Sequence, residues 1–506
     1  MESLSDIKWD VVISGTGLQQ SLLALALSRS GKNILHVDPN EYYGAAEAAL
    51  SLQEVDEWAE KHRAAGGDGI FSAAQVTRHE GSEALAFSRA YSLALAPQLI
   101  HTRSELLSQL VSSKAFRQIE FLAVGSFYIY QPASDASQPA ALSRIPSTRE
   151  DIFSNTAIPA KSKRSLMKFL KFVLEYTSES HTEVWKPHAD EPLSGFLATA
   201  FKLDAALQAY IVTLTLSLDG KITVQAGLAS IHRHLTSMGV FGAGFAAVYP
   251  KWGGLSEVAQ VGCRASAVGG AVYMLGVGIK GVQKSLPTEE NKEGGLDVAL
   301  ANDVTVKSRR LIQASTGAAA DSLRVSRLTA VVNSNLLPLF ETVVEGAPTP
   351  SVTVIAFPAG SALGEDGSSS DFPIYAMAHS SDAGECPSGQ SVIYLSTVSS
   401  PNSQDHLGRA LSSLLTAAKP GEQTAGPLYQ LSYEQTGING ASLSVEENIA
   451  SFSLPPLDLA FNDSVLGPVK EAWEFIMSDI VSEEREDYMA FKDREGAEID
   501  EDEFDN

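Results

Sequence analysis

Residues 11–20 read VVISGTGLQQ, and this stretch decides the fold expected for the start of the chain. Its first three residues are β-branched and predict a short buried strand, and its two glycines predict a tight turn. A helix is expected over residues 18–29, with Gly31 beyond it as a stop signal. A second strand is expected over residues 33–38. Strand, turn, helix and strand in this order predict a βαβ unit.

The predicted turn nearly matches the Gly-x-Gly-x-x-Gly pattern of dinucleotide-binding folds. Gly15 and Gly17 occupy the first two glycine positions, and Asp38 stands where an acid that binds a ribose belongs. The third glycine position, where the helix packs beneath the pyrophosphate, holds Gln20. This long amide predicts a Rossmann-type unit without a cofactor, with Gly15, Gly17, Gln20 and Asp38 as a degenerate remnant. A flavin-dependent oxidoreductase remains the alternative from another class, and it would have to bind its cofactor despite Gln20.

The composition disfavours several other classes of function. The chain has 506 residues and a net charge of −24, which disfavours nucleic acid and anionic lipid headgroups as direct ligands. Two cysteines cannot form a disulfide framework, so a reducing compartment is expected. We find no His or Cys spacing typical of a metal site, no P-loop and no nucleophile elbow. With no signal-peptide pattern and no apolar run of membrane-spanning length, we expect a cytoplasmic protein with no metal and no catalytic residues.

Composition along the chain predicts several parts. Residues 1–150 are expected to form the first part of a large lobe, and residues 241–470 its second part, rich in glycine and in Val- and Ile-rich strands. Between them, residues 151–240 are expected to form a separate helical lobe. Residues 471–506 are expected to be an acidic tail that is disordered in part. Stretches of small and polar residues predict loops over residues 59–82, 131–141, 285–296 and 360–371.

Three amphipathic helices are expected in the middle of the chain. Apolar residues recur there at intervals of three and four, which is the spacing of one helix face. The stripes consist of Leu166, Phe169, Leu170, Val173 and Leu174, then Leu207, Tyr210, Ile211 and Leu214, and last Val224, Leu228, Ile231, Leu235 and Met238. Such stripes usually indicate a packed core, but they can also line a cavity for an apolar ligand. Methionines such as Met238 would suit an irregular cavity.

Four blocks of sequence resemble the Rab escort and GDP-dissociation-inhibitor family, in the family's own order. The blocks are residues 15–18 with 35–38 and 40–44, then 95–99 with 116–121, then 144–148 with 163–170, and last 249–275. The chain departs from the family pattern at Ala45, where a second glycine is usual, and at Val258-Ala259, where Leu-Pro is usual. One residue is also inserted between Gly253 and Glu257. Four blocks in order are a specific signal, although each alone is weak.

This resemblance implies an α/β fold, with a sheet-containing large lobe similar to FAD- and NAD(P)-binding proteins and a smaller all-α lobe. It implies no cofactor. The partners that it implies are GDP-bound Rab GTPases, prenylated or awaiting prenylation, together with their geranylgeranyl lipid and a transient membrane contact. GDP-bound Rab would be preferred because the nucleotide orders or releases its switch segments.

The resemblance also implies roles for residues that match family motifs. The Rab-binding platform would consist of Tyr43, Glu257, Arg264 and Met274. The flexible Rab C-terminus would be bound by Leu106, Leu110, Phe116, Ile119 and Phe121. The lipid pocket would be lined by Leu166, Phe169, Leu170, Val173, Tyr210, Leu214, Leu228 and Ile231.

Two roles within the family stay open. Escort proteins present new Rab proteins to the α/β heterodimer of Rab geranylgeranyltransferase, whereas inhibitors retrieve prenylated, GDP-bound Rab from membranes. Residues 35–38 and 165–170 resemble the escort branch more closely, which favours the escort role. The chain would then be an accessory, non-catalytic component of the transferase. By linkage, a carrier that prefers GDP-bound Rab also slows the release of GDP.

Overall fold

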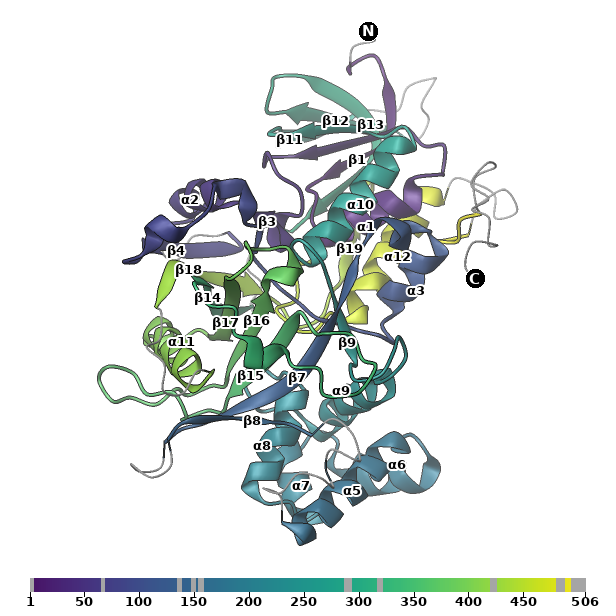
Figure 1. The fold of residues 1–506 in the computed structure, drawn as a ribbon. Coiled ribbons are helices and arrows are strands. Elements are labelled where there is room, and N and C mark those ends of the chain that lie inside the picture. The colour runs from purple at the N-terminus through teal and green to yellow at the C-terminus, as the bar shows by residue number, and fades with distance from the viewer. Residues whose placement is uncertain are drawn as a thin grey trace, which may run out of the picture.

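The computed structural model describes residues 4–64, 69–133, 139–146, 152, 159–285, 294–315, 322–418, 426–478 and 487–492. Within these residues, two large sheets are flanked by helices, and a group of helices extends from the lower end (Figure 1). In the same residues, no helix has both the length and the apolar character needed to cross a bilayer. The expected combination of a sheet-containing part and a helical part is therefore found.

The first sheet contains the predicted βαβ unit. β1 (Lys8–Ser14) and β2 (Ile34–Asp38) are parallel neighbours joined by α1 (Leu18–Leu27), as the sequence predicts. The order of the sheet is β10 (Val272–Leu275), β2, β1, β13 (Thr305–Ala314), β12 (Gly295–Leu300) and β11 (Ile279–Ser285), with β20 (Ile449–Phe452) on β13 and β19 (Leu443–Glu446) on β20. α1 packs between this sheet, α10 (Leu255–Val268) and α12 (Leu466–Met477), so every one of its residues is buried.

α1 and α10 approach each other very closely, and a glycine allows this. A Cβ atom added to Gly262 on α10 would lie 2.5 Å from the carbonyl oxygen of Ser21 on α1. The backbones therefore touch where most helix pairs are separated by side chains. This contact fixes α10, whose outer face carries two of the predicted platform residues.

The second sheet forms the middle of the molecule. Its order is β4 (Phe71–Arg78), β18 (Pro427–Gly437), β14 (Leu323–Val332), β17 (Ser391–Val398), β16 (Ile374–Ser380), β15 (Val352–Phe357), β7 (Phe121–Gln131), β9 (Ala247–Pro250) and β6 (Ile100–His101), with β8 (Ala141–Arg144) on β7. α11 (Ser403–Ala418) packs on one face, against β14 and β17. A small pair, β3 (Ala49–Leu50) and β5 (Leu93–Ala94), lies beside it, and α3 (Glu105–Ser112) follows β6.

The predicted loop over residues 59–82 is wrong in two places. Its first residues complete helix α2 (Leu52–Lys61), which begins at a capping box formed by Ser51 and Glu54. Its second half forms β4, which pairs with β18. The apolar residues of this strand do not alternate regularly with polar ones, so its conformation comes from its sheet neighbour rather than from its own pattern. The loop predicted over residues 360–371 contains no helix or strand, as expected. Of the loops predicted over 131–141 and 285–296, residues 134–138 and 286–293 lie outside the described residues.

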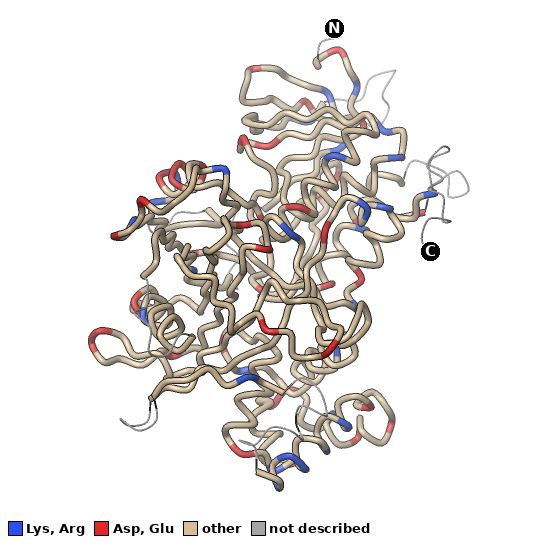
Figure 2. Tube along the Cα trace, viewed as in Figure 1, with Lys and Arg blue, Asp and Glu red and all other residues tan. Residues whose placement is uncertain are grey.

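The middle of the chain is helical, as predicted. The three expected helices are α5 (Ala160–Leu174), α8 (Ala205–Leu214) and α9 (Val224–Ser237), and the pattern missed α6 (Glu179–Trp185) and α7 (Leu193–Ala200). The apolar sides of α5, α7, α8 and α9 meet in one cluster, which includes Phe169, Val173 and Leu228. The basic face of α5 points away from this cluster and shows as blue segments at the lower end of the molecule (Figure 2).

The tail begins later than expected. α12 continues past residue 471 to Met477, because its Ala472, Trp473 and Ile476 complete the core against α1. Residues 487–492 also pack on this core: Met489 is buried, and the guanidinium of Arg29 lies 4.6 Å from the centre of the Phe491 ring. The predicted disorder falls on residues 479–486 and 493–506, which lie outside the described residues.

Candidate functional site

The glycine turn between β1 and α1 is filled by a side chain of the protein itself. Gly15 has a φ of +91°, so the chain turns there as in dinucleotide-binding folds. The side chain of Gln20 folds back along this turn. Its amide nitrogen would lie 3.5 Å from a Cβ atom at Gly15, and its amide oxygen 3.1 Å from one at Gly17. Gln20 thus occupies the space over the two glycines where a pyrophosphate would need to approach the backbone.

A carboxylate of the protein lies at the N-terminus of α1. Glu47, at the end of the short 3₁₀ turn η1 (Ala45–Glu47), accepts a hydrogen bond from the backbone N–H of Leu18 at 3.1 Å. The first turn of a helix attracts anions because its N–H groups have no partners within the helix. Glu47 therefore takes the position that a phosphate takes in the nucleotide-binding members of this fold. Burial raises the pKa of this carboxyl group to about 7.

The predicted ribose-binding acid is fully engaged within the protein. One carboxylate oxygen of Asp38 accepts hydrogen bonds from the backbone N–H and the hydroxyl of Thr16, at 2.6 and 2.7 Å. The other accepts from the backbone N–H and the side-chain amide of Asn40, at 2.7 and 3.0 Å. Asp38 has no exposed surface, and burial raises the pKa of its carboxyl group. Its acceptor capacity is used in holding β2 and its following turn against the glycine turn.

These three side chains do not fit a bound dinucleotide. Gln20 lies over the glycines, Glu47 caps α1, and Asp38 has no free oxygen lone pair directed at an open site. The nucleotide-binding fold is therefore present, while the positions of its ligand are taken by the protein's own polar groups.

Two of the predicted platform residues lie on the outer face of α10. Glu257 and Arg264 are two helical turns apart and share this face. Burial raises the pKa of the Glu257 carboxyl group, and the positive charge of Arg264 opposes this shift. The guanidinium of Arg264 is exposed and donates to the side-chain oxygen of Gln118 at 3.4 Å. Gln118 belongs to the short turn η4 (Ala115–Gln118), which packs beside α10.

The other two platform residues lie on different faces. Tyr43 follows β2 on the α10 side of the sheet, half-buried, with its ring 6.3 Å from that of Tyr273. Met274 is the next residue on strand β10, so its side chain points to the opposite face, where it packs with Val37 and Leu35. The structure thus brings Tyr43, Glu257 and Arg264 to one side of the sheet and leaves Met274 on the other.

The segment predicted to hold a Rab C-terminus is mostly core. Leu106, Leu110 and Ile119 are buried beneath α1 and α12, with at most 8% of their surface exposed, so in this structure they cannot contact a partner. Leu106 and Leu110 are four residues apart on α3, which is the spacing of an inward helix face. Phe116 is 38% exposed and Phe121 is half-buried, and these two remain accessible.

The predicted lipid pocket is divided between a closed core and a small cavity. Five of the predicted residues are buried in the core of the helical part: Leu166, Phe169, Val173, Leu228 and Ile231. Tyr210 is half-buried, and its hydroxyl lies 2.9 Å from that of Ser143. Leu170 and Leu214 line a cavity between the helices and the strands β7 and β9.

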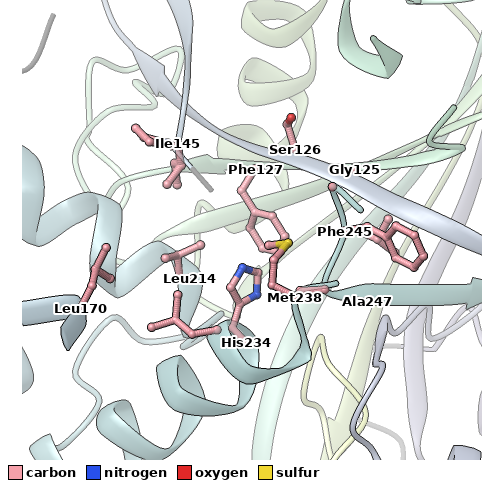
Figure 3. A pocket seen from close by; sticks show the side chains of 15 residues that line it. Gly125, Ser126, Phe127, Ile145, Leu170, Leu214, His234, Met238, Phe245 and Ala247 are labelled. Atoms are coloured by element: carbon pink, nitrogen blue, oxygen red, sulfur yellow. The ribbon is translucent and has the colours of Figure 1, made fainter. Parts of the chain in front are cut away.

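This cavity is lined mainly by apolar side chains from both parts of the molecule. Figure 3 shows Met238, Phe127 and His234 close together, with Leu214 next to them and Leu170 on the helix further to the left. The imidazole of His234 is buried, and burial lowers its pKa to about 4, so it is neutral. The free volume is about 40 Å³. A cavity needs about 10–15 Å³ of such space to hold one water molecule, so the cavity in this form has room for a few water molecules and not for a long apolar chain.

Sequence reasoning identified Met238 as a possible liner but missed the strand side of the cavity. Its liners there are Val124, Gly125, Ser126, Phe127, Ala246 and Ala247. No helical periodicity could have found them, because they lie on β7 or at the start of β9 and not on a helix. The sequence of β7 shows which residues share a face of the strand, but it does not show which part of the molecule that face contacts.

Comparison with known proteins identifies the family to which this sequence is similar. The family model described as GDP dissociation inhibitor matches residues 5–342. Rab proteins geranylgeranyltransferase component A of Saccharomyces cerevisiae is 32% identical over 77% of this chain and 61% of its own length, and that of Candida albicans is 29% identical over 77% and 59%. Rab escort protein 1 of Arabidopsis thaliana is 23% identical over 92% of both chains. The chain thus spans about three-fifths of the length of the two yeast relatives.

Solved structures confirm the fold. The crystal structure of Rab GDI from Plasmodium falciparum is similar with a TM-score of 0.65 at 18% identity, covering 93% of this chain and 98% of that one. An oxidoreductase from Methanosarcina mazei is similar with a TM-score of 0.56 at 12% identity, covering 92% and 99%. The α/β fold with a flavoprotein-like sheet is therefore as expected. Because the family model covers more than half of the sequence, the chain belongs to the GDP dissociation inhibitor family.

Proposed function

We propose that this chain is a Rab escort protein: it binds GDP-bound Rab GTPases, presents them to the Rab geranylgeranyltransferase heterodimer and delivers the prenylated Rab to membranes. The observation that carries this proposal is the 32% identity with a component A of Rab geranylgeranyltransferase along 77% of the chain. In this role the chain has no catalytic residues of its own. It works from the cytoplasm and touches membranes when it delivers its cargo.

The filled glycine turn supports a binding function rather than redox chemistry. A flavin would have to displace Gln20 and Glu47 and to compete with Thr16 and Asn40 for Asp38. Each lost contact would leave a buried polar group without its partner, which costs about 1–3 kcal/mol per group. A purified sample that releases flavin on denaturation would contradict this part of the proposal.

The outer face of α10 supplies the contact surface for Rab. Arg264 is exposed and Glu257 half-exposed, so both can form charge-assisted hydrogen bonds with polar groups of a partner. Tyr43 adds a rigid ring on the same side of the sheet. Met274 faces the other side, so it would contact Rab only around the edge strand β10.

The helical part, residues 151–240 in our proposal, supplies shelter for the lipid. A geranylgeranyl chain has about twenty carbons, and each buried CH₂ group contributes about 0.8 kcal/mol. The apolar cavity lined by Leu170, Leu214 and Met238 is the natural entry point, but its volume of about 40 Å³ is far too small for such a chain. Lipid binding therefore requires α5, α8 and α9 to separate from one another or from β7. The closed core of Phe169 and Leu228 would then join the pocket.

Prenylation in a reconstituted system tests the proposal. The full chain, a GDP-loaded Rab GTPase, the transferase heterodimer and labelled geranylgeranyl diphosphate are combined, and lipid transfer to Rab is measured with and without the chain. We expect transfer to depend strictly on the chain. Arg264→Ala should weaken binding of GDP-loaded Rab several-fold. Arg409→Ala is the matched control, because Arg409 is also an exposed arginine but lies on α11.

The recycling inhibitor is the second candidate, since a probable secretory pathway GDP dissociation inhibitor of Schizosaccharomyces pombe is 25% identical over 61% of the chain. An inhibitor would use the same face and the same cavity. It would extract prenylated Rab from membranes and leave prenylation unchanged. Transfer that proceeds equally well without the chain would therefore refute the escort role and favour the inhibitor.

A further inference from the structure

A tryptophan with an unusual backbone precedes the helix that carries Glu257 and Arg264. The turn between β9 and α10 consists of residues 251–254, and Trp252 within it has a φ of +66°. Bulky residues rarely adopt this left-handed conformation, which costs on the order of 1–3 kcal/mol. Nevertheless Trp252 is 48% exposed. A glycine would adopt this backbone conformation with less strain. Because the indole is about half exposed, burial in the core does not explain why a tryptophan occupies this position.

Contacts with two neighbouring segments hold the strained backbone in place. The N–H of Trp252 donates to the carbonyl oxygen of Ala383 at 2.9 Å, and its carbonyl oxygen accepts from the hydroxyl of Ser92 at 2.7 Å. The indole ring lies on Gly384, where any side chain would collide with it. The direction of the ring is thus set by two segments that lie far from it in sequence.

A salt bridge with Glu120 also fixes Lys251, whose ammonium lies over the ring of Trp252. The ammonium of Lys251 lies 4.8 Å from the centre of the indole ring of Trp252. The same ammonium binds both carboxylate oxygens of Glu120, at 2.9 and 3.0 Å. A cation held over an aromatic ring stabilises its orientation. The ring is therefore ordered before any partner arrives, so binding it loses little side-chain entropy.

The turn that carries the ring leads directly into α10. Glu257 lies in the first turn of the helix, Arg264 two turns further, and Val268, which is 64% exposed, at its C-terminal end. Phe116 of η4, 38% exposed, flanks the same helix. Aromatic residues and arginine are enriched at protein interfaces, so exposed Trp252, Phe116 and Arg264 suit a protein partner better than a small ligand.

We propose that Trp252 is the aromatic anchor of this surface and inserts into an apolar depression of the GDP-bound Rab that docks along α10. This inference rests on the proposed function and adds a residue that sets the strength of the contact. Tryptophan is among the three residue types enriched at the few positions that dominate the energy of an interface. The strain in the turn is then the cost of presenting the ring outward at a fixed angle.

A substitution separates this role from a purely structural one. Trp252→Gly removes the ring and also suits the positive φ, so it relieves strain instead of adding it. We expect its unfolding temperature to equal or exceed that of the unchanged chain. We expect its affinity for a GDP-loaded Rab, measured by titration calorimetry, to fall at least about tenfold. Trp252→Phe should retain part of the affinity.

Leu363→Ala serves as the matched control for loss of an exposed apolar side chain. Leu363 is 59% exposed, on the loop beside α11, and its loss should leave the affinity unchanged. Radical footprinting of the unchanged chain gives a second readout that needs no variant. Oxidation of the Trp252 indole should fall when GDP-loaded Rab is added.

The outcomes separate the anchor from the proposed function. If Trp252→Gly binds Rab as tightly as the unchanged chain while Arg264→Ala binds weakly, the anchor is refuted and the proposed function stands. An indole that stays equally reactive in the complex refutes it as well. If the unchanged chain binds no GDP-loaded Rab at all, the proposed function fails and the anchor fails with it.

Discussion

The carboxylate at the start of α1 should make the stability of the protein depend on pH. Glu47 has a pKa of about 7 in the folded chain, against an ordinary value of 4.5, because burial disfavours its charged form. A raised folded pKa means that the folded state holds the proton more tightly than the unfolded state. Its contribution to stability is fully present below pH 4.5 and is lost as the pH rises through 7.

The size of this contribution follows from the shift. The full difference between the two pKa values corresponds to about 3 kcal/mol at 1.36 kcal/mol per pKa unit. Glu47 is only half-buried, so solvent screens part of this, and we expect about 1–2 kcal/mol. Glu47→Gln keeps the hydrogen-bond acceptor for the N–H of Leu18 but cannot ionise. The variant should match the unchanged chain near pH 5 and exceed its free energy of unfolding by about 1–2 kcal/mol near pH 8.

Urea unfolding of both chains at intervals from pH 5 to pH 8 measures this difference. Other titrating groups affect the two chains equally, so subtracting one curve from the other isolates Glu47. A difference that stays constant across this range would refute the reasoning, because it would mean that the carboxyl group titrates near its ordinary value. A variant that is less stable at pH 8 would show that the ionised carboxylate benefits from the helix N-terminus more than it loses by burial.

Three further outcomes are expected. Gly262→Ala places a Cβ 2.5 Å from the carbonyl oxygen of Ser21 and should lower stability by about 1–3 kcal/mol in thermal unfolding, whereas Gly408→Ala, with open space around it on α11, should not. Glu385→Ala removes a buried carboxylate that accepts three hydrogen bonds from tyrosine and histidine side chains, so it should cost about 3–6 kcal/mol, and a loss below 1 kcal/mol would contradict this. Met238→Trp fills the apolar cavity, so prenylated Rab should bind this variant no better than unprenylated Rab, and retained discrimination in a binding assay would contradict the placement of the lipid.

The start of the fold could be predicted because its signals are local. A buried strand, a glycine turn and a helix follow one another within residues 8–27, and each is specified by its own residues. β4 could not be predicted in the same way, since its conformation depends on pairing with β18, which lies more than 300 residues further along the chain. The same holds for residues 487–492, whose few apolar side chains find their place only on the finished core.

The site was predictable in chemistry but not in geometry. A glutamine in place of the third glycine already indicated that a phosphate site would be disturbed, and Gln20 does lie over that site. Glu47 gave no such signal, because it reaches α1 from 29 positions away. Apolar spacing also could not tell Leu170, which lines the cavity, from Phe169, which is core, because neighbouring positions on a helix differ only in the partner that they face.

A cofactor that binds only the folded state stabilises a protein in proportion to the logarithm of its concentration. Gln20, Glu47 and Asp38 stabilise the nucleotide-binding unit in a different way, because they are attached to the chain and cannot diffuse away. Their effective concentration is the same in every cell and at every stage of synthesis. In the proposed carrier, folding of the unit formed by β1, α1 and β2 would therefore not depend on a supply of flavin, and its lifetime would not follow the metabolic state of the cell.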